Sequence, residues 1–297
     1  MKIINPYDYK GEFYKGNLHT HTENSPCGHY SLKDVIKMYT SYKMEYDFLA
    51  ITDHYKLTDL SKYNNREDIL LIQGVEHKKC DHQTLGINIS KYDDDENDDN
   101  NHNELFKKIN NQGGINIICH PHMGKEDYWT FEELLKLDGY TGIEVFNNNV
   151  RMDCKGRAVA TDVWDKLLSN GKIVFGFAND DMHLFSRVGG GYNMVLSEEK
   201  TIDSILNAIR RGSFYASFGI KVKNIELKDN IISVENGDAR VPYVFFKFIG
   251  KDGVTLKEEK GNKGTYEVKG DEGYVRVEVY REDGARAWLQ PFVIENN

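Results

Sequence analysis

Histidine and acidic residues occur together in several short clusters, most of which directly follow an apolar run. The clusters are Asn17-Leu18-His19-Thr20-His21, Thr52-Asp53-His54, Gly74-Val75-Glu76, Asp81-His82, Cys119-His120-Pro121-His122 and Asp180-Asp181-Met182-His183. His19 and His21 are two residues apart, so on an extended strand their imidazoles lie on the same side and can reach one metal ion. A single histidine on a strand is more often a core or surface residue, but recurrence at several strand ends favours a shared metal site.

The types of ligand indicate which metals such a site would hold. Imidazole and carboxylate together suit zinc, manganese or iron. The cysteines Cys27, Cys80, Cys119 and Cys154 are scattered without a Cys-x-x-Cys pair, which argues against an iron–sulfur cluster, a structural zinc site and a disulfide framework. Divalent ions held in this way, with one coordination position open to water, are typical of hydrolytic sites.

Alternating strands and helices are expected to position these clusters. Apolar runs predict strands at 13–19, 48–52, 69–72, 115–119, 142–146, 173–178 and 213–217, and helical periodicity predicts helices from Ser31, from Thr130 and over 104–111, 156–169 and 202–211. This alternation predicts a parallel sheet in an α/β fold, and enough repeats predict a closed barrel. The chemistry of such barrels lies at the C-terminal ends of the strands, where the clusters occur.

The pattern of the sequence changes near Gly219. Short alternating stretches follow at 222–227, 231–234, 244–249, 265–268 and 274–280, separated by turn sequences such as Asn-Gly and Glu-Asp-Gly. They predict a small antiparallel β-sandwich domain. We therefore expect two domains, residues 1–218 and residues 219–297, packed together because no long linker joins them.

Composition restricts the classes of partner. The 297 residues include 47 acidic and 38 basic ones, which gives a net charge of −9. No basic stripe is present, so duplex nucleic acid is not expected as the main ligand. No apolar stretch is long enough to span a bilayer and no secretory signal follows Met1, so we expect a cytoplasmic protein without a membrane partner.

Taken in order, the motifs His-x-His, Thr-Asp-His, Gly-x-Glu, a following His, His-Pro and Asp-x-His resemble those of the polymerase and histidinol phosphatase (PHP) superfamily of metal-dependent phosphoesterases. The similarity runs from about Asn17 to Gly219 and includes residues 211–217, Arg-Gly-Ser-Phe-Tyr-Ala-Ser, which resemble the segment that closes this domain in one branch. Residues 273–279, with Ala287-Trp288 and Pro291, resemble the small β domain of that branch. The resemblance covers nearly the whole chain.

The resemblance implies a distorted (β/α)7 TIM-like barrel that holds two or three divalent ions and hydrolyses a phosphate ester with metal-activated water. It implies His19, His21, Glu76 and Asp181 as ligands of a first ion, His54 and His183 as ligands of a second, and His82 and His120, bridged by Glu76, as ligands of a third. Asp181 and His183 are then also catalytic residues. The ions expected are zinc, manganese or iron.

The chain departs from the family pattern near the second ion. Family members place an Asp or His shortly after the first motif, where this chain reads Ser25-Pro26-Cys27-Gly28-His29. Cys27 aligns with that position, and His29 lies close enough to replace it. The second ion would then bind more weakly, or would be selected toward zinc if the thiolate takes part.

Other residues lie close to the expected ligands. His77 should point away from the face that carries Glu76, and His122 and Asp180 are expected to orient ligands rather than to bind metal. Arg187 follows the last cluster, and its guanidinium could clamp phosphate oxygens. An arginine in a loop is as often merely exposed, so both interpretations of Arg187 stay open.

The substrate class also stays open. A small phosphomonoester or a short oligonucleotide suits an acidic protein better than a long duplex does. The alternatives are a nuclease or nucleotide phosphatase and, outside the enzymes, a non-catalytic metal-dependent binding module. A complete set of ligands argues against the binding module.

Overall fold

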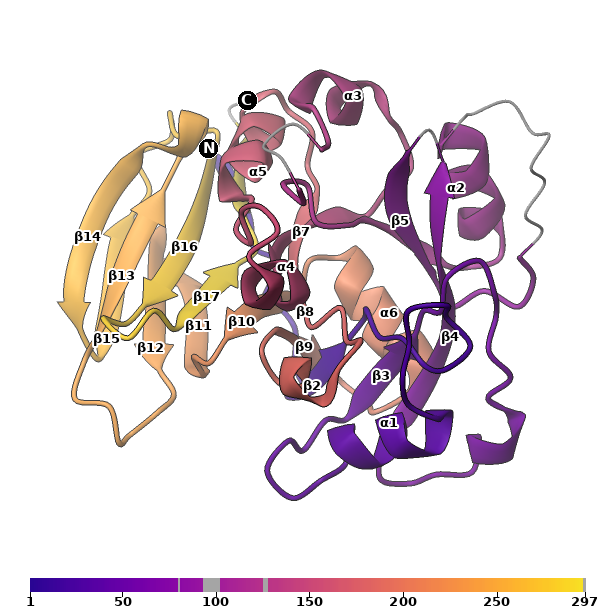
Figure 1. The fold of residues 1–297 in the computed structure, drawn as a ribbon. Coiled ribbons are helices and arrows are strands. Elements are labelled where there is room, and N and C mark those ends of the chain that lie inside the picture. The colour runs from indigo at the N-terminus through magenta and orange to yellow at the C-terminus, as the bar shows by residue number, and fades with distance from the viewer. Residues whose placement is uncertain (80, 93–101, 125–127, 296–297) are drawn as a thin grey trace.

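The computed structural model describes residues 1–79, 81–92, 102–124 and 128–295. A mixed sheet with helices on its outside forms the larger part of the molecule, and an all-β part lies beside it (Figure 1). Both chain ends lie at the all-β part, because β1 (Lys2–Ile4) pairs with β18 (Phe292–Glu295). Cys80 lies outside the described residues, and the described cysteines are free thiols.

Strands of the larger part form one hydrogen-bonded series in the order β10-β9-β2-β3-β4-β5-β6-β7-β8. Their bounds are β2 Glu12–Asn17, β3 Phe48–Ile51, β4 Leu70–Lys79, β5 His82–Ile87, β6 Ile115–Ile118, β7 Gly142–Asn147, β8 Phe175–Asn179, β9 Tyr192–Ser197 and β10 Phe214–Phe218. The pairs β2–β3, β3–β4, β6–β7 and β7–β8 are parallel, as expected. The pairs that involve β5 or β9 are antiparallel, so the sheet is mixed.

The hairpin of β4 and β5 differs most from the sequence prediction. The apolar run 69–72 predicted a strand that ends before Glu76, but β4 continues to Lys79 and pairs with β5. A continuous apolar run is the pattern that predicts a buried strand, and the polar residues Glu76 and His77 interrupt that pattern. Both are buried all the same, so Glu76 lies within a strand and not at its end.

A closed barrel is not confirmed. Among the described strands, β8 ends the series and has no backbone ladder to β9 or β10. Side-chain amides bridge this seam instead: Asn193 Oδ1 accepts from the Ala178 N–H at 3.1 Å and Asn193 Nδ2 donates to the Ala178 carbonyl at 2.9 Å. Gln290 makes the same pair of bonds to Gly176 at 2.9 and 2.8 Å. These amides satisfy backbone groups that a sheet edge would otherwise leave unpaired.

Helices cover the outside of the mixed sheet (Figure 1). They are α1 Leu32–Tyr39, α2 His102–Asn111, α3 Phe131–Lys136, α4 Asn148–Asp153, α5 Thr161–Ser169 and α6 Ile202–Arg210, with short 3₁₀ turns η1 Ser61–Tyr63, η2 Phe185–Arg187 and η3 Lys251–Gly253. Ser31 caps α1 and Thr130 caps α3, as their sequence patterns predicted. No helix in the described ranges is long and apolar enough to cross a membrane.

The helix expected over 156–169 begins later than predicted, at Thr161. The residues before it run extended along β7: Val159 bridges Phe146, and the Asn147 N–H donates to the Ala158 carbonyl at 3.0 Å. Tertiary pairing with β7 therefore overrides local helix propensity here.

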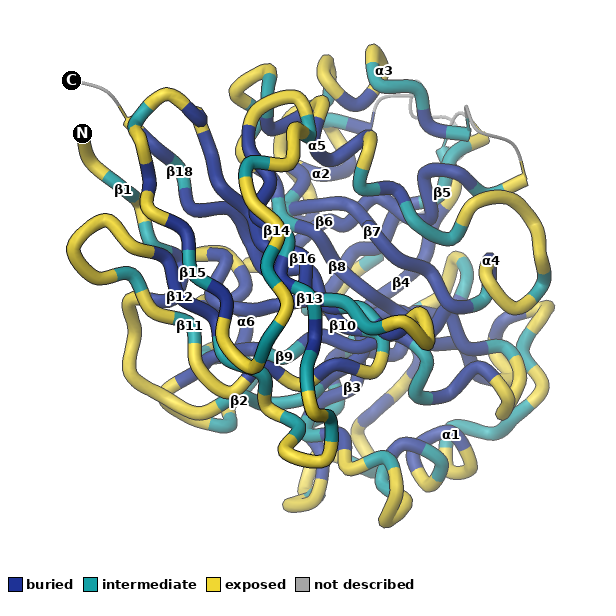
Figure 2. Tube along the Cα trace, turned by 90° about the vertical axis from the view of Figure 1, so that its left-hand side faces the viewer, coloured by how far each residue is buried: buried dark blue, intermediate teal, exposed yellow. Residues whose placement is uncertain are grey.

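The all-β part contains two sheets with a common core. Its remaining strands are β11 Val222–Lys228, β12 Ile231–Asn236, β13 Val244–Ile249, β14 Thr255–Gly261, β15 Lys263–Glu267, β16 Tyr274–Tyr280 and β17 Arg286–Leu289. β11, β12 and β15 form one antiparallel sheet, and β14, β13, β16 and β17 continue the large sheet beyond β10. Apolar side chains such as Phe246, Val277 and Ile232 fill the space between the sheets. Buried segments run along β13 and β16, whereas β14 is exposed or partly buried along its length (Figure 2).

A buried ion pair joins the all-β part to the helical part. Arg276 on β16 donates from Nε and Nη2 to the two oxygens of Asp165 on α5, each at 2.7 Å. The Tyr274 hydroxyl donates to the same carboxylate at 2.8 Å. Both Arg276 and Asp165 are buried. The pair therefore fixes one helix of the larger part on the sheet of the smaller part.

We expect Asp165→Asn to lower the free energy of unfolding by about 3 kcal/mol, because it leaves the guanidinium of Arg276 buried beside a neutral amide. Urea denaturation measures this loss. Glu295→Gln, which removes the partner of the exposed Lys2, is the control and should change stability little. The double variant Asp165→Leu/Arg276→Met should recover most of the loss, and a single variant as stable as the wild type would contradict the interpretation.

Candidate metal centre

Four imidazoles from three separate segments surround the carboxylate of Glu76. Its Oε2 lies 3.3 Å from His19 Nε2, 3.2 Å from His21 Nε2 and 3.1 Å from His54 Nδ1. Its Oε1 lies 3.4 Å from His120 Nε2. Glu76 is almost fully buried, so these imidazoles take the place of water around its charge.

Asp181 provides a second carboxylate on the same cluster. Its Oδ1 lies 3.3 Å from His19 Nε2 and 3.4 Å from His21 Nε2. The same oxygen lies 3.3 Å from His183 Nδ1. His19 and His21 therefore stand between the two carboxylates, and the structure brings together all the predicted ligands of the first and second ions.

Backbone pairing between loops holds these residues in place. Thr20, between the two histidines that follow β2, forms a parallel bridge with Met182 after β8, and the His21 N–H donates to the Met182 carbonyl at 3.1 Å. His54, after β3, bridges Glu76 in β4. His120 and Asp181 adopt left-handed backbone conformations, with φ of 28° and 50°. Non-glycine residues rarely do so, and such strain is concentrated at functional sites.

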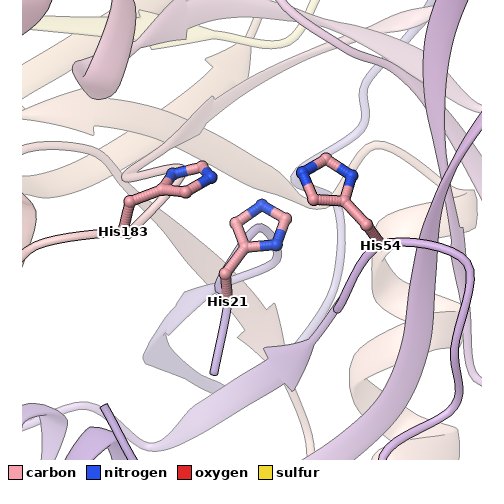
Figure 3. Close-up of side chains that lie close together, drawn as sticks. All are labelled: His21, His54 and His183. Carbon is pink, nitrogen blue, oxygen red and sulfur yellow. The ribbon is translucent and has the colours of Figure 1, made fainter. Parts of the chain in front are cut away.

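The donor set fits divalent cations. His19 Nε2, His21 Nε2 and Glu76 Oε1 are buried and have no hydrogen-bond partner in the described structure, which is rare for buried polar atoms. One nitrogen each of His21, His54 and His183 lie within 4.8 Å of one another, and the three rings converge in Figure 3. A second group within that distance comprises His19, His21 and Glu76.

Electrostatics support the same interpretation. Burial lowers the pKa of His19, but the nearby carboxylates of Asp181 and Glu76 outweigh burial and raise this pKa well above its ordinary value. Burial raises the pKa of Glu76, but the nearby imidazoles of His19 and His120 hold it well below its ordinary value. The carboxylates thus require positive charge nearby, which a divalent ion supplies.

Glu144, in the middle of β7, is a further member of the site that the sequence analysis missed. Its Oε1 accepts from His19 Nδ1 at 2.8 Å, and its Oε2 accepts from the His120 backbone N–H at 2.8 Å. Asn179 and Asn147 donate to the same carboxylate at 2.9 and 2.8 Å. A proton on His19 Nδ1 leaves Nε2 free to face Glu76 and Asp181. An available signal was a lone charged residue inside an apolar strand, because buried charges are normally paired.

Asp53 organises the loop after β2. Its carboxylate accepts from the Thr22 N–H at 2.7 Å and from the Ser25 hydroxyl at 2.7 Å. Ser25 Oγ in turn lies 3.1 Å from His21 Nδ1. Asp53 therefore orients His21 through Ser25, and its backbone carbonyl accepts from the Glu76 N–H at 3.2 Å.

The same loop places Cys27 beside His183. Cys27 Sγ lies 3.1 Å from His183 Nε2, and both Cys27 and His29 are exposed. The structure therefore places a thiol next to the cluster at the position where the family pattern has an Asp or His.

Two predicted site residues lie away from the cluster. The His82 ring stacks on Trp129 with a centroid distance of 4.3 Å and meets the Tyr128 ring edge-on at 5.3 Å. No group of candidate ligands in the described ranges includes it. Arg187 is buried and donates to Asn149 at 3.0 Å and to Asp153. Its guanidinium ties the loop after β8 to α4.

The neighbouring residues have structural partners. His77 is buried and bonds to Thr84 on β5. His122 lies 3.0 Å from an oxygen of Asp162. Asp180 accepts from the Gly189 and Gly191 N–H groups at 2.9 and 2.8 Å. Asp180 was expected to orient a ligand. Its hydrogen bonds hold the loop that follows Asp181, which comes closer to that expectation than the contacts of His77 or His122 do.

The chain matches no protein-family model and no curated protein. Among solved structures it is similar to a two-domain protein from Bacteroides vulgatus ATCC 8482 that contains a predicted PHP-like metal-dependent phosphoesterase, with a TM-score of 0.52, 16% identity and 94% of each chain covered. The PHP resemblance is therefore confirmed as a likeness of fold across both parts of the chain.

Weaker similarities connect the chain to two further structures. PsfC from Pseudomonas syringae PB-5123 has a TM-score of 0.46 and 11% identity over 66% of this chain and 87% of its own. Endonuclease Q, in complex with a 27-mer duplex substrate with an abasic lesion, has a TM-score of 0.49 and 12% identity over 67% of this chain and 56% of its own.

We expect Glu144→Gln to weaken metal binding about 10-fold to 100-fold, because the side-chain amide cannot hold the proton on His19 Nδ1 as a carboxylate does. Competition with a chromogenic chelator measures the dissociation constant. Glu132→Gln, an exposed substitution on α3, is the control. Equal metal affinity of Glu144→Gln and the wild type would contradict the role assigned to Glu144.

We expect Cys27 to contribute a sulfur ligand to an ion held with His54 and His183. Protein loaded with cobalt should then show a near-ultraviolet sulfur-to-cobalt absorption band, which Cys27→Ser removes. Cys154→Ser, at another exposed cysteine, and His29→Ala should retain the band. A band that persists in Cys27→Ser would show that the thiol is only a neighbour of His183.

Proposed function

We propose that this chain is a metal-dependent hydrolase of phosphate esters. The observation that carries the proposal is the convergence of five imidazoles on the buried carboxylates of Glu76 and Asp181 at 3.1 to 3.4 Å. A binding surface does not need buried charge at this density, because charge removed from water is costly unless it is neutralised. The shared fold with a two-domain PHP-like protein agrees with the proposal.

The distances support three sets of ligands. His19, His21, Glu76 and Asp181 would hold one ion, and His54 and His183 with Cys27 a second. His120 with the second oxygen of Glu76 is the available set for a third, without His82. When bound, such ions lower the pKa of a water molecule and neutralise charge that develops on the phosphate in the transition state.

The protein side chains orient the ligands and restrict water. Glu144 holds the proton of His19 on Nδ1, and Asp53 acts through Ser25 on His21. Burial of Glu76 and Glu144 removes bulk water from their side of the cluster. His54 and His183 are partly exposed, so a substrate approaches from their side. Arg187 is assigned to positioning α4 and not to contact with phosphate.

The substrate proposed is a phosphorylated small molecule or a short oligonucleotide, so nuclease and nucleotide phosphatase activities remain within the proposal. The expectation that duplex nucleic acid is not the main ligand depends on the net charge of −9 and on the absence of a basic stripe in the sequence. Net charge does not determine the potential over one face of a protein. Duplex DNA therefore belongs in the same panel of substrates.

Removal and return of metal tests the proposal. We expect chelator-treated protein to lose hydrolysis of generic phosphomonoesters or phosphodiesters and to regain it with manganese or zinc. Asp181→Ala should lower turnover at least about 100-fold, because it removes a carboxylate shared by three imidazoles. Elemental analysis of the same samples reports the number of ions per chain.

Asp138→Ala, which removes an exposed carboxylate paired with Lys172, is the matched control and should behave as the wild type. Stoichiometric metal without cleavage of any ester would contradict the hydrolase and favour the metal-dependent binding module. Hydrolysis that is unaffected by Asp181→Ala would place the activity elsewhere.

A further inference from the structure

Basic and aromatic side chains alternate across the sheet of the all-β part. Lys260 on β14 is the register partner of Phe245 on β13, and Phe245 is the partner of Tyr280 on β16. Tyr280 pairs with Arg286 on β17, and Arg286 pairs with Phe218 on β10. Register partners point to the same face of a sheet. These side chains therefore form one line across five strands.

The line lies on the outer face of the sheet. The chain neighbours Val244, Phe246, Val279 and Ala287 are buried in the core between the two sheets. Phe245, Tyr280, Arg286 and Phe218 are only partly buried, and Lys260 is exposed. Strand alternation thus places apolar residues in the core and this line at the surface.

Ring and cation contacts run along the line. The rings of Phe245 and Tyr280 stack with a centroid distance of 4.9 Å and an interplanar angle of 13°. Lys260 Nζ lies 3.6 Å from the ring centroid of Tyr243 and 5.4 Å from that of Phe245. These distances are within the range of cation–π attraction.

The other end of the line reaches the helical part beside the metal centre. The guanidinium of Arg151 on α4 lies 4.7 Å over the ring of Phe218. α4 begins directly after Asn147, whose Nδ2 lies 3.2 Å from Asp181 Oδ2. Arg151 is four residues further along a helix that rises about 1.5 Å per residue. Figure 1 shows α4 next to β17 and β10.

The charge along the line is positive. The acidic neighbours are Glu258, which lies 3.5 Å from Lys247, and Glu278, which lies 3.7 Å from Arg276 and 2.6 Å from Arg286. Both carboxylates are therefore neutralised by cations of the same sheet. Within the described ranges, neither Lys260 nor Arg151 has a carboxylate partner. The two ends of the line keep their charge in a protein whose net charge is negative.

We propose that Lys260, Phe245, Tyr280, Arg286, Phe218 and Arg151 form a binding track for single-stranded nucleic acid that leads a strand end to the metal centre. The proposal rests on the proposed hydrolase and names the substrate class of the same site. The rings of Phe245 and Tyr280 offer aromatic faces to unpaired bases, and Lys260 and Arg151 offer charge to phosphates. Phe218, stacked on Phe146 at a centroid distance of 5.1 Å, supports Arg151. Five strands at about 4.8 Å spacing extend the track over about 19 Å, enough for a short oligonucleotide.

Duplex nucleic acid does not suit this track, since its bases are already stacked and offer no free face to the rings. A small sugar phosphate does not need it, because it cannot span from the metal centre to Tyr280 or Phe245. Among the proposed substrates, the track therefore favours a single-stranded oligonucleotide.

Fluorescence anisotropy with the full-length protein tests the track. The probe is an end-labelled oligothymidylate of about ten nucleotides with a phosphorothioate backbone, which resists cleavage. We expect Tyr280→Ala and Lys260→Glu each to raise the dissociation constant about tenfold, because one removes a stacking face and the other reverses a charge. The same probe annealed to its complement should bind at least about tenfold more weakly to the wild type.

Tyr9→Ala is the matched control, because Tyr9 is another exposed ring under a guanidinium, that of Arg211 at 4.0 Å, outside the track. It should bind the probe like the wild type. If Tyr280→Ala proves unstable in urea, Lys260→Glu still tests the track, because Lys260 is exposed and its substitution should leave the fold intact. No binding by the wild type, equal binding by Lys260→Glu, or equal binding of the duplex would overturn the track.

Binding of an uncleaved probe does not depend on hydrolysis, so the two proposals fail separately. Weakened binding in the track variants without any esterase activity in the wild type would support the track and refute the hydrolase. Metal-dependent hydrolysis of small esters with unchanged oligonucleotide affinity in the variants would support the hydrolase and overturn the track.

Discussion

Two buried carboxylates, those of Glu76 and Asp181, are the groups on which the arrangement of this protein depends. A carboxylate out of water is stable only beside positive charge or hydrogen-bond donors. Here the donors come from the loops after β2, β3, β6 and β8, so these loops must all reach one point. Left-handed backbone at His120 and Asp181 indicates that the surrounding contacts overcome local preference.

The sheet makes this convergence possible although it is not a simple parallel barrel. The antiparallel hairpin of β4 and β5 carries Glu76 inside a strand, where its neighbours are fixed by the ladder. At the open seam, Asn193 and Gln290 replace backbone pairing with side-chain amides. β10 belongs to the sheet of both parts, and the ion pair of Asp165 and Arg276 adds a second connection. The outer face of the all-β sheet is therefore held at a fixed position beside α4.

Fold and activity are supported by different kinds of observation. Similarity at 16% identity over 94% of the chain establishes a shared two-part fold. A fold can host many chemistries, so the case for a hydrolase depends on the ligand types, their distances and their buried, unpartnered atoms. The acidic composition describes the whole molecule, while the line of lysine, arginine and aromatic side chains describes one face. The two are compatible because screening limits the reach of distant charges.

The sequence by itself determined the types of the candidate ligands, their order along the chain, the alternation of strands and helices, and the change to a β module near Gly219. Each of these depends on local pattern: period two in strands, capping residues, and histidines two residues apart. Only the tertiary structure decided that Glu144 holds His19 and that Cys27 rather than His29 lies beside His183. It also decided that His82 packs on Trp129 and that Arg187 is hydrogen-bonded to Asn149. Side-chain alternation specifies which face a residue occupies, but its partners come from segments distant in sequence, and their positions exist only once the chain is packed.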